Sequence, residues 1–175
     1  MSKTIHVSLS TKGINAAIRE IRKYKNELRE KQMRLLKRIS DELANEAQQN
    51  FDASQYDDII GEGTRRPNVT LHSGQSNNLF VVIADGEEAV FVEFGAGVYY
   101  NGAAGSSPHP YGVELGYTIG DYGWGFGQFD EWGYTDANGK YRLTHGTPAA
   151  MPLYNAGVAI RQNARVLALA HFRSY

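Results

Sequence analysis

The chain has 175 residues and a net charge of -1, with 42% hydrophobic and 21% charged residues, which is typical of one folded domain. Its near-neutral charge gives no general attraction to nucleic acid or to an anionic membrane. The lack of cysteine excludes disulfides, cysteine-based zinc sites and thiol nucleophiles. No segment approaches the ~18 apolar residues of a membrane span. Residues 1–7 lack the apolar core of a signal peptide, so we expect the chain to fold in a cytoplasm.

The charges are distributed unevenly along the sequence. Ten Lys or Arg residues stand against three Glu between Lys12 and Arg38, a local net charge of +7, so the rest of the chain sums to -8. A molecule with one basic end and an acidic remainder can attract copies of itself. It can equally present a basic face to an acidic partner.

The first third of the chain predicts a short strand followed by a long helix. Polar and apolar side chains alternate over residues 3–9, and Ser10 or Thr11 can cap a helix. Over residues 13–50, isoleucine and leucine recur at spacings of three, four and seven. A helix of that length would extend about 55 Å. We therefore expect it either to break or to project from the domain.

The basic residues of this helix allow two interpretations, a solvated face or a contact surface for a partner protein or DNA. The interface hypothesis singles out Arg19, Lys23 and Arg34. Lys25 and Gln32 occupy positions where a coiled coil needs apolar side chains, which argues against a sustained coiled coil.

A central hairpin is the clearest β-structure signal. Asp85-Gly86 is typical of a two-residue type I′ turn, which would pair residues 79–84 with residues 87–94. Both faces of that hairpin would be apolar. One face should therefore be covered by a helix, and the other by a further layer or a neighbouring subunit.

The segment before this hairpin predicts a loop and a short strand. Residues 51–68 are rich in polar and turn-forming residues and indicate a loop, while residues 69–72 indicate a strand on which His72 would face solvent.

The segment after the hairpin is rich in glycine and aromatic residues. Ten glycines lie between Gly95 and Gly127, so the backbone can turn freely, and large aromatic side chains on such a backbone suit an ordered loop. Those aromatics could fold onto the chain's own core, enter a subunit interface or stack on carbohydrate. The candidate interface residues here are Tyr122, Trp124, Phe126, Phe129, Trp132 and Tyr134.

Two further elements are expected towards the C-terminus. Asp136-Ala-Asn-Gly139 predicts a second hairpin with arms at residues 133–135 and 141–144. A closing helix begins at Pro148 or Pro152 and should pack on one face of the central hairpin. Its predicted apolar face consists of Leu153, Ala156, Ile160, Ala164, Leu167 and His171, widened by Val166, Leu169 and Phe172.

These elements predict an α+β fold in a single domain. It would comprise a long N-terminal helix, a small antiparallel sheet built on the central hairpin, an inserted lobe and a C-terminal helix packed on the sheet. The corresponding segments are residues 10–50, 69–97, 98–147 and 148–173.

Motifs for catalysis or metal binding are weak. The acidic residues Asp52, Asp57, Asp58 and Glu62 match neither the calcium-loop nor any zinc spacing, which indicates a solvated loop. His109 and His145 lie among prolines and glycines without a partner motif, so we expect surface histidines. We predict no catalytic residue, metal or cofactor.

Two motifs in a fixed order carry a family resemblance. The first is Val92-Glu-Phe-Gly-Ala-Gly97, and the second is Pro148-Ala-Ala-Met-Pro-Leu-Tyr-Asn-Ala156 at the start of the closing helix. In this order, after a basic helix, the chain resembles the neck and tail-completion family of long-tailed double-stranded-DNA phages, related in role to the minor tail protein Z group of lambda-like phages. The resemblance covers most of the chain outside residues 99–145.

The resemblance implies a structural virion protein at the head–tail junction, assembled in the host cytoplasm, without catalysis. Its partners would be further copies of itself in a ring, of six subunits first and of twelve as the alternative. The head-closure protein and a tail-terminator or tail-tube protein would be its neighbours, DNA would pass nearby, and no membrane would be involved.

Two other functions remain as alternatives. A glycan- or cell-wall-acting enzyme could use Asp130, Glu131 or Glu93 as acids, with aromatic residues stacking on sugars. A DNA-binding module could use the basic helix, although aromatic residues are not interleaved with its basic residues as single-strand binding would favour.

Overall fold

The structure is a computed structural model. It describes residues 4, 6–55, 61, 63, 65–95, 109–112, 114–115, 132–135, 138–144 and 146–173. The chain is α+β, as predicted. Its elements in order are α1 (Thr11–Ala53), β1 (Thr70–Ser76), β2 (Leu79–Asp85), α2 (Ala89–Phe94), β3 (Trp132–Thr135), β4 (Tyr141–Thr144) and α3 (Pro152–Arg173).

Helix α1 is one unbroken helix of 43 residues. Ser10, the first of the two predicted caps, caps it, because its Oγ accepts a hydrogen bond from the Gly13 backbone N–H at 3.1 Å. Gly13 lets Ser8 approach the first turn of the helix closely, since a Cβ on Gly13 would lie 2.1 Å from the Ser8 Oγ. The helix ends three residues later than expected, so residues 51–53 are helical rather than part of the predicted loop.

Residues 3–9 were expected to form a strand. The described residues of this range, 4 and 6–9, belong to no strand. Their side chains are exposed, and Leu9 is 96% exposed.

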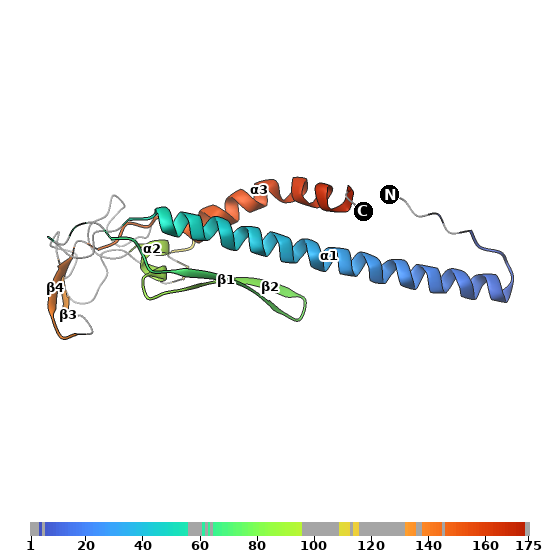
Figure 1. Cartoon of the computed structure of the whole chain (residues 1–175), viewed down its shortest axis with the longest axis horizontal. Helices are drawn as coiled ribbons and strands as arrows, with labels where there is room; N and C mark the ends of the chain where they lie inside the picture. Colours follow the sequence, from blue (N-terminus) through green and yellow to red (C-terminus); the bar gives the residue numbers. More distant parts are fainter. Residues whose placement is uncertain are drawn as a thin grey trace.

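The elements are arranged around α1, which runs along most of the long axis of the molecule (Figure 1). The β1–β2 hairpin lies along one side of α1 and α3 lies along the other. The β3–β4 hairpin sits near the C-terminal end of α1, while the N-terminal part of α1 extends beyond both α3 and the β1–β2 hairpin. The long helix therefore projects, which was one of the two expected outcomes.

Strands β1 and β2 form an antiparallel pair joined by Asn77 and Asn78. The register places Leu71 opposite Ala84 and Gln75 opposite Phe80. Because side chains alternate across a strand, these residues share one face with Ser73, which hydrogen-bonds to Asp41 of α1. That face therefore packs against α1.

The predicted pairing of residues 79–84 with residues 87–94 is wrong. Residues 89–94 form helix α2, and β2 pairs instead with β1. A type I′ turn needs positive φ at both central residues. Asp85 does not adopt positive φ, whereas Asn77, in the turn that does form, has φ 56°. Gly86 lets the backbone at Asn68 approach closely, since a Cβ on Gly86 would lie 2.4 Å from the Asn68 carbonyl oxygen.

Tertiary packing explains why the valine-rich segment 89–94 is helical. The helical turn buries Ala89 and Val92 in the core, and Val92 is 1% exposed. The Val92 carbonyl also accepts a hydrogen bond of 2.8 Å from the Ala150 N–H. These contacts outweigh the preference of valine and phenylalanine for strands, which is small and depends on context.

The main core is a small cluster at the junction of α1, β1 and α2. Phe51, Val69, Ala89 and Val92 are buried there. Leu71, Ala84 and Leu153 pack around them, so the first turn of α3 meets the base of the sheet. The rest of α3 lies against α1.

Helix α3 begins at Pro152, the second of the two predicted starts, and residues 148–150 are not helical. Its predicted inner face is confirmed, because all six residues of that face are buried or half-buried. The predicted widening of this face is wrong, since Val166, Leu169 and Phe172 are 65%, 43% and 38% exposed. The side chains of Arg161 and Arg165 are also exposed.

The second predicted hairpin is confirmed. Strands β3 and β4 pair antiparallel, with Trp132 opposite Thr144 and Thr135 opposite Tyr141. Gly139 in the connecting turn has φ 77°, the left-handed conformation that this turn chemistry requires.

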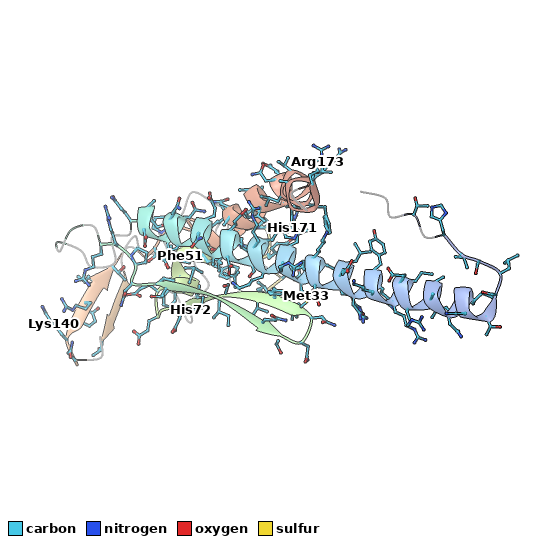
Figure 2. All side chains as sticks on the ribbon, turned by 45° about the vertical axis from the view of Figure 1, so that its right-hand side comes forward. Met33, Phe51, His72, Lys140, His171 and Arg173 are labelled. Atoms are coloured by element: carbon cyan, nitrogen blue, oxygen red, sulfur yellow. The ribbon has the colours of Figure 1, made fainter. Side chains whose placement is uncertain are left out.

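His171 fastens the end of α3 to the middle of α1. Its side chain is buried, and its Nε2 donates a hydrogen bond of 3.0 Å to the Lys31 carbonyl oxygen. Figure 2 shows His171 between the two helices.

Loss of a buried hydrogen bond and its packing should lower the free energy of unfolding in a His171→Ala variant by about 1–2 kcal/mol. Urea denaturation measures this change, and the exposed Phe172→Ala variant should change it less.

Candidate functional site

The feature that joins the two motifs is the buried carboxylate of Glu93. This residue is 4% exposed and lies in α2. Its Oε2 accepts a hydrogen bond of 2.8 Å from the Leu153 N–H, and its Oε1 accepts one of 2.9 Å from the Tyr154 N–H. The first backbone amides of a helix lack partners within that helix. Glu93 therefore caps α3 from 60 residues away in the sequence.

The local backbone positions both partners of this contact. Gly95 ends α2 with φ 83°, and its N–H bonds to the Phe91 carbonyl at 2.8 Å. On the other side, Met151 adopts φ 54° directly before α3. The bond from the Ala150 N–H to the Val92 carbonyl fixes the distance between the segments. Backbone and side-chain contacts thus hold the two motifs together.

His109 completes the cluster, and its predicted surface position is wrong because it is 5% exposed. Its Nδ1 accepts a hydrogen bond of 3.1 Å from the Tyr111 N–H. The proton must therefore be on Nε2, which lies 3.1 Å from the Glu93 Oε1. The ring also packs against Phe94, with centroids 4.4 Å apart, and against Tyr154 at 5.2 Å.

A pocket of about 400 Å³ lies beside this cluster. Its walls include Val90, Phe94, Tyr111 and Leu153, together with Glu93 and His109. The lining is mostly apolar, since the polar atoms of the Glu93–His109 pair are engaged within the chain.

This arrangement suits a structural clamp better than proton transfer. Both carboxylate oxygens of Glu93 accept hydrogen bonds from backbone amides at a helix N-terminus, where negative charge is also favoured by the helix dipole. Both ring nitrogens of His109 are likewise hydrogen-bonded within the chain. Within the described ranges, no group of three or more acidic or histidine side chains is placed to hold a metal ion.

The role of Glu93 does not follow from the sequence, which suggests this residue only as a possible acid of an enzyme. A charged residue within an apolar run, two residues before a glycine turn, was the available signal. Finding its partner required the fold, because the donors at Leu153 and Tyr154 become available only when α3 begins at Pro152.

A second candidate site is the projecting segment of α1, defined as residues 11–28. The tip of the β1–β2 hairpin approaches α1 at Asn78, which lines a small pocket with Arg29 and Met33. Helix α3 ends near Lys31. The projecting segment lies beyond both, and at 1.5 Å per residue it extends about 27 Å (Figures 1 and 2).

An apolar stripe follows the projecting segment. Ile14, Ile18, Ile21 and Leu28 share one helix face and are 44%, 41%, 55% and 39% exposed. The next apolar residue at this spacing, Leu35, is 8% exposed because the rest of the chain covers α1 there. The same face of α1 is therefore covered in its second half, whereas in its first half the isoleucines and Leu28 are exposed and the small Ala17 between them, at 8%, is buried.

The third candidate surface is the outer face of the β1–β2 hairpin, which points away from α1. Leu79 and Ile83 lie on this face and are 63% and 55% exposed, with Val81 between them. His72, opposite Ile83, is exposed on the same face, as predicted. The predicted hairpin of residues 79–94 with two apolar faces does not form, but β2 alone carries apolar side chains on both of its faces, and α1 covers one of them.

The predicted interface residues fall into two groups. Arg19 and Lys23 are exposed on the projecting segment, whereas Arg34 lies beyond it and approaches Glu30 at 3.9 Å. The structure does not test four of the remaining candidates, because they lie outside the described residues: Tyr122, Trp124, Phe126 and Phe129. Trp132 and Tyr134 belong to β3, but their side chains also lie outside the described part.

Asp41 links the hairpin to α1 and should make stability depend on pH. Hydrogen bonds from Lys37 and then from Ser73 hold the pKa of Asp41 below its usual 3.8. The stabilisation is therefore complete above pH 3.8 and is lost as the pH falls through the lower pKa of the folded state. The stability difference between wild type and Asp41→Asn should be largest near neutral pH and shrink below pH 3.8. Urea denaturation across this pH range measures it, and a difference that grows on acidification would contradict the assignment.

No protein-family model, curated protein or solved structure matches this chain. Among the residues that the structure describes, no helix combines the length and apolar character that a membrane crossing requires.

Proposed function

We propose that this chain is a structural protein of the phage head–tail junction and that it assembles there as a ring. The observation that carries the proposal is the hydrogen-bonded contact between the two motifs of the resemblance. Val92-Glu-Phe-Gly95 and the segment at Pro152 lie far apart in the sequence, yet Glu93 binds the start of α3 directly. The motifs therefore form one structural unit. Two short sequences that matched the family by chance would not be expected to contact each other.

The shape and the exposed surfaces support assembly through protein contacts. An apolar stripe on the projecting segment and an apolar outer face of β2 both lie open in the single chain. Large exposed apolar patches are uncommon in monomeric proteins and mark interaction sites. In the proposed role, copies of the chain form a ring, and a head-closure protein and a tail-terminator or tail-tube protein bind its two sides.

The proposal predicts particular behaviour of the purified full-length chain. Light scattering after size-exclusion chromatography, over a concentration series, should show a mass that rises towards a closed ring. Electron microscopy of the largest species should show rings. Co-purification with the head-closure and tail-terminator proteins of the same phage should then identify the neighbours. Failure to bind either neighbour, in both monomeric and assembled form, would reject the location at the junction.

The enzyme alternative makes a separate prediction. Turnover of a cell-wall glycan by the wild-type chain, lost in an Asp130→Asn variant that assembles normally, would favour a hydrolase over a purely structural role.

The basic residues of the projecting segment favour an additional contact with passing DNA. Arg19, Arg22 and Lys23 are exposed there. Such contact would be non-specific and would weaken steeply with salt, because it releases counterions from the phosphates. Fluorescence anisotropy with a duplex at several salt concentrations measures it, and binding that does not respond to salt would contradict this role.

A further inference from the structure

We propose that the projecting segment of α1, residues 11–28, docks on the outer face of the β1–β2 hairpin of a second copy of this chain. This inference deepens the ring assembly of the proposed function and rests on it. The contact is heterologous, meaning that two different surfaces meet, and such a contact closes into a ring when its rotation allows.

The first argument is the open continuation of a covered helix face. From Leu35 onward the apolar face of α1 is buried within its own chain, while Ile14, Ile18 and Ile21 on the same face are exposed. The hairpin tip and the end of α3 both reach α1 near residues 29–36, so neither of them covers the projecting segment. A second sheet laid on this segment would continue the packing of helix on sheet that α1 already makes.

The second argument is the unused face of β2. The inner face of the hairpin binds α1 through Ser73 and Asp41. The outer face presents Leu79, Val81 and Ile83, of which Leu79 and Ile83 are more than half exposed. This strip offers apolar side chains at strand spacing, which a helix stripe of isoleucines can cover.

Charge complementarity selects the partner. The projecting segment, residues 11–28, carries five Lys or Arg against two Glu, while residues 70–95 carry four acidic residues and no Lys or Arg. One of those four, Glu93, is buried, but Asp85 and Glu87 are exposed beside the hairpin. Opposite charges on the two surfaces steer them together and favour the correct pairing.

The same charges disfavour pairing of two projecting segments with each other. Two copies of this segment would bring like charges together, and Lys25 would fall within the apolar seam. A symmetric coiled coil is therefore the weaker solution, and the sheet of a second copy is the better occupant.

The test uses two double variants that each remove one of the two surfaces. Ile18→Asp with Ile21→Asp changes the helix surface, and Leu79→Asp with Ile83→Asp changes the sheet surface. All four side chains are at least 41% exposed, so the fold should be retained, which circular dichroism checks. Val166→Asp is the matched control, because Val166 is 65% exposed on α3, outside both surfaces.

We expect the wild type and Val166→Asp to assemble alike, and each double variant to need at least about 100-fold higher concentration, because two apolar contacts are replaced by buried charge. A mixture of the two double variants should form a one-to-one pair and stop there. In that pair, the intact sheet surface of one variant meets the intact helix surface of the other. Light scattering or native mass spectrometry measures the masses.

Three results would overturn the inference. They are a wild type that stays monomeric throughout the concentration series, double variants that both assemble like the wild type, and a mixture that forms no pair. The last result would indicate a symmetric contact if only the helix variant loses assembly. Binding to head-closure and tail-terminator proteins is a separate readout, so the proposed location and the proposed docking surface can fail independently.

Discussion

Replacing Glu93 with glutamine is expected to lower the free energy of unfolding by about 3 kcal/mol. The carboxylate accepts hydrogen bonds from Leu153, Tyr154 and His109, and it is buried. An amide has one acceptor oxygen, so its NH₂ group would face a backbone N–H and leave that donor unsatisfied. The change also removes the negative charge at the N-terminus of α3.

Urea denaturation followed by circular dichroism measures this loss. The matched control is Glu87→Gln, an equally conservative change at an exposed residue just before α2, which should alter stability by less than about 0.5 kcal/mol. Equal effects of the two changes would show that Glu93 does not anchor α3. A selective effect would show that the two motifs are energetically coupled, and hydrogen exchange should then locate the loosened amides at Leu153 and Tyr154.

Truncation of Phe51 to alanine is expected to cost about 4 kcal/mol, the largest effect of any substitution considered. Phe51 is fully buried in the cluster with Val69, Ala89 and Val92. It is also one of three large side chains below 2% exposure in the described part of the chain. A core this small has little neighbouring material that could collapse into the cavity.

Phe91→Ala provides the control for this second change. It removes the same atoms from a residue that is 47% exposed, and we expect a loss below about 1 kcal/mol. Because Phe51 joins α1 to β1 and α2, its truncation should also lower the cooperativity of unfolding. Similar losses in the two variants would mean that the cluster is not the main core of the chain.

These two residues show how differently the sequence reveals structure. Phe51 lies at the end of a long periodic pattern, but the polar residues that follow it immediately predict a loop from residue 51 onward. Glu93 was visible as a charge within an apolar run, but its partners lie 60 residues away. Neither role could be found from local spacing, because each depends on a contact between distant segments.

Local patterns alone determined several elements correctly. The periodicity of α1, its Ser10 cap, the β3–β4 hairpin and the inner face of α3 all follow from interactions within a few residues. Side-chain spacing, capping and turn chemistry act at that range, so the sequence predicts them directly. The uneven charge of the chain and its two-faced apolar strand are also properties of the sequence itself.

Tertiary structure decided the remaining features. Segment 89–94 has the composition of a strand. It is nevertheless a helix, because Val92 is buried and its carbonyl accepts a hydrogen bond from the Ala150 N–H. His109 has no sequence partner, yet it is buried against Glu93. Which face of α1 stays open depends on where α3 and the hairpin tip end. These outcomes depend on long-range packing, whose free energy exceeds the small local preferences of individual residues.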